Sequence, residues 1–172
     1  MNRYFSSTRD GLLKECSDCF SHALGASSSD FELEDFSELH AILTPHGAAC
    51  DGFVVQSHAI KALSLALQQK SQRKVTFVVL GTDHRMRPTY ASLKNWVTPL
   101  GVVQNERELT TAIAEVGSIP IEEGMAEEEH SLENQLPLLQ YLAMEMKETS
   151  GSPLEWSIVP ITVGRSKDGA LS

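Results

Sequence analysis

The sequence predicts an α/β fold with a largely parallel or mixed central sheet flanked by helices. Two nearly continuous apolar runs, at 74–80 and 156–163, are typical of buried strands that are covered on both faces. Segments with a helical period lie between them, as expected for alternating strands and helices. The chain of 172 residues suits one domain, 1–172, with an N-terminal helix and loop over 1–37 and a core over 38–165.

The first half of the chain alternates between helix and strand. Apolar side chains at helical spacing predict a helix over 8–24. A short apolar run at 40–44, which ends at Pro45, predicts a buried strand. Residues 53–69 suit a helix with one broad apolar face, and the strand at 74–80 follows it. A strand, a helix and a second strand form a βαβ unit, which is almost always right-handed.

The second half of the chain continues this alternation. Two short strands are expected around Trp96 and at 102–103, and a helix is expected over 106–116. The last buried strand is expected over 156–163, with a polar tail from Gly164 onward. Few helices remain to cover both faces of a sheet, so we expect a fold that is incomplete at its C-terminus.

A long helix is expected over 131–147, where apolar residues form one stripe at helical spacing. Ser131 is a candidate N-cap for this helix. Pro137 removes an amide donor and crowds the preceding turn, so it predicts either a bend or a helix that begins later.

The charge balance argues against several classes of partner. With 14 Lys and Arg against 23 Asp and Glu, the formal net charge is −9, which disfavours nucleic acid and anionic membrane surfaces. No apolar run reaches the roughly 20 residues of a membrane helix, and the N-terminus lacks the apolar core of a signal peptide. We therefore expect a protein of the cytoplasm or the nucleus.

Cys16 and Cys19 form a Cys-x-x-Cys pair within the first predicted helix. A zinc site needs four ligands, and no second pair follows at a suitable spacing. The total of three cysteines also argues against a disulfide scaffold. The pair is therefore predicted to consist of ordinary reduced thiols.

Two histidines follow the first two predicted strands. His46 comes after the 40–44 strand, and His84 comes after the 74–80 strand. Because sites in open α/β sheets gather beyond the carboxyl ends of strands, both imidazoles are expected at one crevice. Two convergent histidines are the start of a site for zinc, iron or copper. The alternative is that each imidazole caps a strand end and bonds to backbone.

The acidic segment 127–137 is the third candidate feature. His130 and Glu133 are three positions apart, so they share a face if a helix begins by His130. A helix N-terminus keeps a histidine neutral, and a neutral histidine can ligate metal or act as a base. The acidic triplet at 127–129 is interpreted as a solvated first turn.

For the other polar candidates, a purely structural role is an alternative to a functional one. Asp83, beside His84, is either a carboxylate that orients an imidazole or a turn residue, and both interpretations remain open. His22, His40 and His58 lie within predicted elements without a matching partner, so they are interpreted as structural.

Together these segments resemble one family. The resemblance runs from about residue 40 to residue 165 and rests on motifs in matching order. These motifs are Pro45-His46-Gly47 with a loop that ends at Asp51-Gly52, Leu80-Gly81-x-x-His84, Glu129-His130-Ser131-Leu132-Glu133-x-Gln135-Leu136-Pro137, and Ile158-Val159-Pro160-Ile161-x-Val163-Gly164. They resemble the MEMO family, whose bacterial and archaeal members are also called AmmeMemoRadiSam system protein B.

The resemblance implies a fold similar to class III extradiol dioxygenases, which use non-haem iron held by two histidines and a carboxylate. It implies a pocket for a redox metal, iron or copper, and a metal-dependent oxidoreductase activity. The roles that it implies are metal ligation by His46 and His84, catalysis by His130 and Glu133, and pocket lining by Asp83, Cys50 and Asp51.

The chain departs from the family pattern at the first histidine loop, where Ala48-Ala49-Cys50-Asp51 carries no aromatic residue. The family's third metal ligand falls beyond Ser172, and Cys50 is a candidate replacement. Two alternatives to an enzyme follow. One is a non-catalytic signalling adaptor that binds a phosphotyrosine peptide through Arg85, Arg87 or Arg165. The other is a truncated member that has lost the activity.

Overall fold

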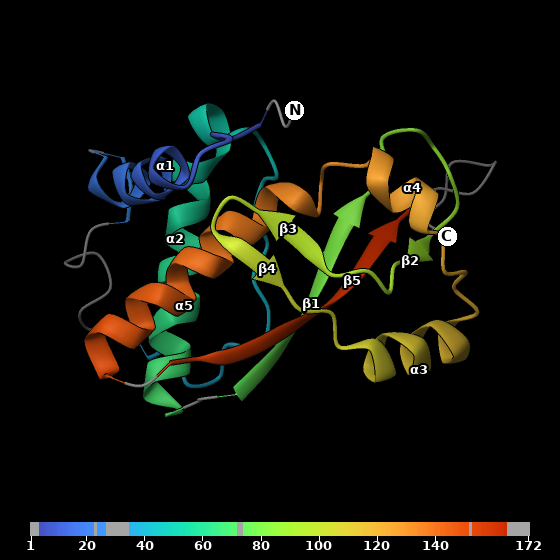
Figure 1. Cartoon of the computed structure of the whole chain (residues 1–172). Helices are drawn as coiled ribbons and strands as arrows, with labels where there is room; N and C mark the ends of the chain where they lie inside the picture. Colours follow the sequence, from blue (N-terminus) through green and yellow to red (C-terminus); the bar gives the residue numbers. More distant parts are fainter. Residues whose placement is uncertain (1–3, 23, 27–34, 72–73, 152, 165–172) are drawn as a thin grey trace.

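The computed structural model describes residues 4–22, 24–26, 35–71, 74–151 and 153–164. Two helices are followed by four strands, then by further helices and a last strand in the described chain (Figure 1). In order they are α1 (Arg9–Ser21), α2 (Ala49–Gln69), β1 (Lys74–Thr82), β2 (Tyr90–Ala91), β3 (Trp96–Thr98), β4 (Gly101–Val103), α3 (Arg107–Gly117), α4 (Glu123–Glu128), the 3₁₀ turn η2 (Glu133–Gln135), α5 (Leu136–Ser150) and β5 (Glu155–Val163).

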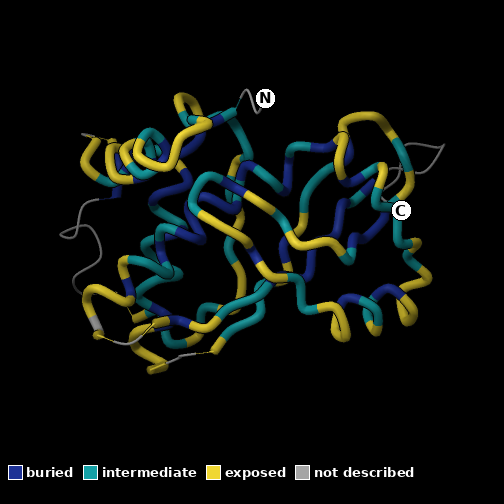
Figure 2. The backbone as a smooth tube through the Cα atoms, viewed as in Figure 1, coloured by how far each residue is buried: buried dark blue, intermediate teal, exposed yellow. Residues whose placement is uncertain are grey.

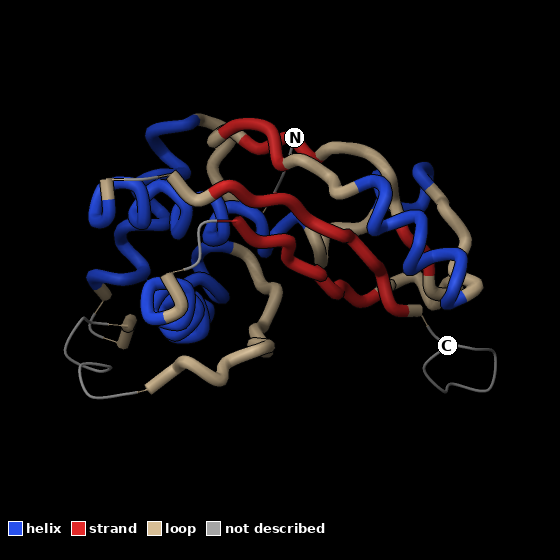
Figure 3. Tube along the Cα trace, turned by 90° about the horizontal axis from the view of Figure 1, so that it is seen from below, coloured by secondary structure: helices blue, strands red, loops and turns tan. Residues whose placement is uncertain are grey.

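The central sheet is mixed and has the strand order β1-β5-β2. β1 and β5 are parallel over nine residue pairs, from Lys74 opposite Glu155 to Thr82 opposite Val163. They lie side by side as the two long strands in Figure 3. β2 pairs antiparallel with β5, and β3 and β4 form a separate two-stranded hairpin. The predicted α/β class with a sheet flanked by helices is therefore confirmed.

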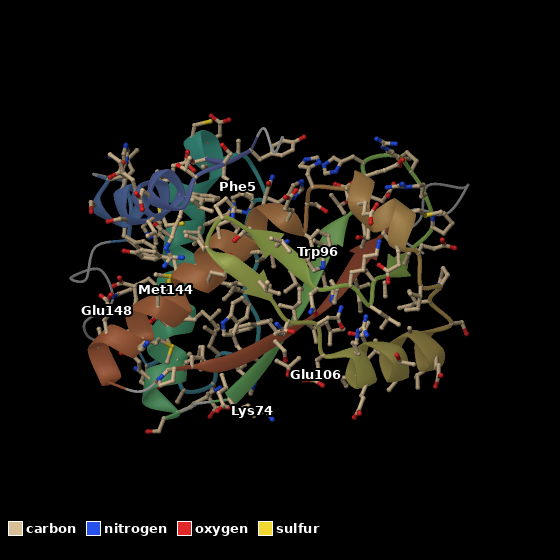
Figure 4. The ribbon with its side chains drawn as sticks, in the orientation of Figure 1. Phe5, Lys74, Trp96, Glu106, Met144 and Glu148 are labelled. Atoms are coloured by element: carbon tan, nitrogen blue, oxygen red, sulfur yellow. The ribbon has the colours of Figure 1, made fainter. Side chains whose placement is uncertain are left out.

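The two faces of the sheet are covered differently. Phe77 and Ile158 face the larger hydrophobic cluster, to which α1, α2 and α5 also contribute. Trp96, labelled in Figure 4, packs against this cluster from the hairpin. On the opposite face, Val159 and Ile161 form a smaller cluster that includes residues of α3. Figure 2 shows that burial concentrates where the helices meet the sheet.

β1 is the less protected of the two long strands. Val78 is 51% exposed and Leu80 is 57% exposed, although their register partners on β5, Val159 and Ile161, are buried. α3 contacts β5 and β2 and leaves these two β1 side chains open. In the described residues no strand pairs with the outer edge of β1.

The strand predicted at 40–44 is not formed. These residues have no ladder partner, and Leu43 is 97% exposed. An apolar run becomes a strand only when a neighbouring strand pairs with it, and local sequence does not specify that neighbour. The predicted βαβ unit that would start at this strand is therefore wrong, whereas the parallel partner of β1 is β5.

Two helices begin elsewhere than predicted. α2 begins at Ala49, so Cys50 and Asp51 lie in its first turn instead of in a loop. α5 begins at Leu136, with Pro137 in the first turn, where a missing amide donor costs no helical hydrogen bond. Ser131 is therefore not an N-cap, and His130 and Glu133 do not share a face of a long helix.

The N-terminal helix belongs to the main hydrophobic cluster. Phe5, Leu12, Cys16 and Cys19 are buried there. Both cysteines are free, as predicted. Burial raises the pKa of both thiols, that of Cys19 to about 12, so they remain protonated at neutral pH.

None of the helices in the described part of the chain combines the length and the apolar character needed to cross a membrane.

Candidate metal centre

Three histidines from separate segments meet beyond the carboxyl end of β1. His46 precedes α2, His84 follows β1, and His130 lies between α4 and η2. One ring nitrogen from each lies within 4.8 Å of the others, and the Nε2 atoms of His46 and His84 are 3.1 Å apart. The structure therefore brings together the two predicted metal ligands and adds a third imidazole.

The rings form a stacked group. His130 stacks on His84 with centroids 4.5 Å apart, and His46 meets both rings edge-on. The other face of His130 is covered by Tyr4, whose ring is nearly parallel at 4.3 Å. Tyr4 lies 126 positions from His130 in the sequence and carried no motif that could have indicated this contact.

Glu129 holds the His84 ring in place. Its carboxylate is 2% exposed and accepts a hydrogen bond from His84 Nδ1 at 2.8 Å. It also accepts from the backbone amides of His84, His130 and Ser131. Because Nδ1 carries the donated proton, the lone pair of His84 is on Nε2, the atom that faces His46. The interpretation of 127–129 as a solvated turn is wrong for Glu129.

The turn that carries Glu129 and His130 is fastened to the end of β1. Ser131 Oγ donates to the Thr82 carbonyl oxygen at 2.9 Å and accepts from the Thr82 amide at 3.0 Å. This approach requires a glycine, because a Cβ atom on Gly81 would lie 2.4 Å from Ser131 Oγ. The Leu80-Gly81-x-x-His84 motif therefore has a physical role in bringing two histidine segments together.

The protonation states suit metal ligation. Burial lowers the pKa of His46 and of His130, and the neighbouring His84 lowers both further, whereas Glu129 opposes these shifts. Burial by itself raises the pKa of Glu129, but hydrogen bonds from His84, Ser131 and His130 outweigh it and the net pKa is lowered. Two neutral imidazoles thus lie beside an ionised carboxylate at neutral pH.

Asp83 is a turn residue, which was one of its two open interpretations. Its Oδ1 accepts from the backbone amides of Arg85 and Arg87, and its Oδ2 accepts from Arg87 Nε and the Tyr90 hydroxyl. Burial raises its pKa, but the hydrogen bonds and the Arg87 charge lower it below the ordinary value of 3.8. Asp83 supports the His84 loop, and Glu129 is the carboxylate that orients the ring.

The remaining predicted site residues do not belong to the three-histidine group. Cys50 is exposed in the first turn of α2 and, like Asp51, is not part of the three-histidine group. Glu133 lies in η2 and lines a cavity of about 240 Å³ together with Glu129 and Trp96. Arg165 lies outside the described residues.

The donor set fits a metal ion. Two imidazole nitrogens on one ion, each at about 2.0–2.1 Å from it, lie no more than about 4.2 Å apart. The Nε2 separation of 3.1 Å between His46 and His84 is within that limit. His84 is 41% exposed, so an ion can reach the group from solvent. The three histidines are therefore positioned to bind a metal.

Comparison with known proteins identifies the family. The sequence profile of the family described as "Memo-like protein" matches residues 14–170. The chain belongs to the Memo-like family. This confirms the resemblance carried by the His46, His84 and His130 motifs.

Three curated relatives illustrate how much of the chain is matched. A MEMO1 family protein of Caldivirga maquilingensis is 27% identical over 143 residues, which cover 81% of this chain and 49% of the relative. A MEMO1 family protein of Aeropyrum pernix is 32% identical over 145 residues, which cover 81% of this chain and 50% of the relative. A MEMO1 family protein of Thermococcus kodakarensis is 39% identical over 93 residues, which cover 52% of this chain and 30% of the relative. The chain thus spans about half the length of the first two relatives.

Proposed function

We propose that this Memo-like chain binds a redox metal ion, iron or copper, through His46, His84 and His130, and acts as a metal-dependent oxidoreductase. The observation that carries the proposal is the convergence of three imidazoles from three segments, with two Nε2 atoms 3.1 Å apart. Imidazole ligands suit iron and copper. When bound, such an ion supplies one-electron chemistry and open positions for dioxygen or a substrate.

The residues of the chain have distinct parts in this proposal. Glu129 holds the Nδ1 proton of His84 and so directs the Nε2 lone pair toward the ion. Tyr4 covers one face of His130 and excludes water from it. The half-exposed His84 leaves an open side by which a small substrate can approach. His130 serves as a ligand in this arrangement, and Glu133 stays a predicted catalytic group.

The adaptor alternative has weaker support. A phosphotyrosine peptide needs free cationic donors, but Arg85 pairs with Glu128 at 2.7 Å, and Arg87 pairs with both Asp83 and Glu128. A bound phosphate would have to displace these carboxylates. Binding of a phosphotyrosine peptide therefore stays a prediction.

The metal content of tag-free protein tests the proposal. We expect near-stoichiometric iron or copper by mass spectrometry, and its loss in the His46→Ala, His84→Ala double variant. The matched control is the His22→Ala, His40→Ala double variant, which removes two imidazoles outside the three-histidine group and should keep the metal.

The result that would contradict the proposal is folded protein without a bound metal ion. Circular dichroism establishes that every variant is folded. A folded wild-type chain that holds no metal after purification, and none after addition of ferrous or cuprous ions without oxygen, would overturn the proposal. Metal-loaded protein that takes up oxygen with a reductant would support the oxidoreductase part.

A further inference from the structure

Asn134 connects the backbones of two of the three histidines. Its backbone amide donates to the His130 carbonyl oxygen at 3.0 Å. Its side-chain Nδ2 donates to the His46 carbonyl oxygen at 2.9 Å, across 88 positions of sequence. The side chain is buried, with 1% of its surface exposed.

The His46 segment depends on this contact. Residues 40–47 form no strand, so no ladder holds their backbone. Within this segment, the backbone carbonyl of His46 accepts a hydrogen bond from the side chain of Asn134. His130, in contrast, is held by the Glu129 and Ser131 contacts next to it.

We infer that Asn134 is a positioning residue, which holds the His46 backbone against the His130 backbone and so sets the separation of their imidazoles. The inference rests on the proposed metal function and names a residue that tunes it. Ligand positions must be held within about 0.5 Å for full activity of a designed or natural site. A hydrogen bond to the backbone carbonyl of His46 restricts the movement of the residue that carries the imidazole.

A second observation separates this role from simple packing. Asn134 Oδ1 is buried without a hydrogen-bond partner among the described residues. A buried acceptor in that condition destabilises the folded protein, and an apolar side chain of similar size would avoid the cost. The carboxamide is therefore explained by its donor, Nδ2, which holds the His46 carbonyl.

The test compares cobalt binding by wild-type protein with that by Asn134→Leu, which keeps the number and branching of the side-chain heavy atoms and removes the donor. Co²⁺ is used because its visible absorption reports the number and geometry of ligands. We expect affinity to fall by about tenfold or more, with a changed spectrum. Asn134→Asp should fail in the same way, because a carboxylate cannot donate to the His46 carbonyl.

The matched control is Gln140→Leu. Gln140 is also a buried carboxamide, and its Nε2 donates to the carbonyl oxygen of Gly101, at the start of β4, at 3.1 Å. It lies on α5, where it also accepts a hydrogen bond from Thr98 of the β3–β4 hairpin. This variant should lose thermal stability to a similar extent and keep the wild-type cobalt affinity and spectrum.

The outcomes are distinguishable. If wild-type protein binds Co²⁺ and Asn134→Leu matches it in affinity and spectrum, the positioning role is overturned and the metal function stands. If wild-type protein binds no Co²⁺, the iron and copper test above decides the metal function, and hydrogen exchange in metal-free protein decides the positioning role. Faster exchange over 40–48 in Asn134→Leu than in Gln140→Leu supports it, and equal exchange overturns it.

Discussion

Glu129 and Asp83 are buried carboxylates that both bond to backbone amides of the His84 loop. Glu129 accepts bonds from one imidazole and three backbone amides, and Asp83 accepts from an arginine, a tyrosine and two backbone amides. Both pKa values are lowered by these donors in spite of burial. Each carboxylate therefore fixes a loop geometry that the imidazoles alone could not maintain.

The contribution of His46 and His130 to metal affinity should persist to a lower pH than that of imidazoles with the ordinary pKa of 6.5. Protons compete with the ion for imidazole lone pairs, and the lowered pKa values of His46 and His130 keep both rings neutral below their ordinary value of 6.5. Competition with a coloured chelator, from about pH 8 to about pH 5, measures this dependence. An affinity that already declines between about pH 8 and pH 7 would contradict the prediction. The His40→Ala variant should give the same curve.

His46 and His84 were predictable as site residues because each follows an apolar run. His84 does follow a strand, and His46 reaches the same place although its predicted strand is absent. Glu129 could not be told from the exposed Glu127 and Glu128, since burial depends on which turn lies against β1. Tyr4 could not be found at all, because its contact joins segments with no shared pattern.

Among the elements, helices were predicted better than strands. Helical periodicity is local, so α1, α2 and α3 were found with errors only at their ends. β1 and β5 were found because both are continuous apolar runs. The run at 40–44 has similar composition and remains unpaired, which shows that partner choice is decided by the whole fold.

The packing of α1 gives a prediction about the N-terminal helix. Leu12→Ala should lower the free energy of unfolding by about 2–5 kcal/mol, because Leu12 is fully buried in the main cluster and its loss leaves a cavity. Urea denaturation measures the change. Leu43→Ala is the control, since Leu43 is 97% exposed and should change stability by less than about 0.5 kcal/mol. Equal effects would show that α1 does not pack as described.

At the scale of the whole molecule, the open side of β1 affects solubility. An unpaired edge strand with exposed apolar side chains is a template for association. Leu80→Lys should reduce aggregation at high protein concentration, measured by light scattering, because it places a charge where a second chain would pair. Val102→Lys is the matched control, since Val102 is 54% exposed on the separate hairpin. A similar reduction by both variants would point to general charge effects.

The register of β1 and β5 also has a kinetic consequence. Thr76 and Ser157 touch across the two strands although 81 positions separate them, and closing so long a loop is an unfavourable, slow event in folding. The Asp83 amide, next to His84, bonds to Val163 at the end of β5, so the histidine loops are fixed only after that closure. A metal ion added during refolding would be captured in the slowest phase, and its uptake would time the completion of the sheet.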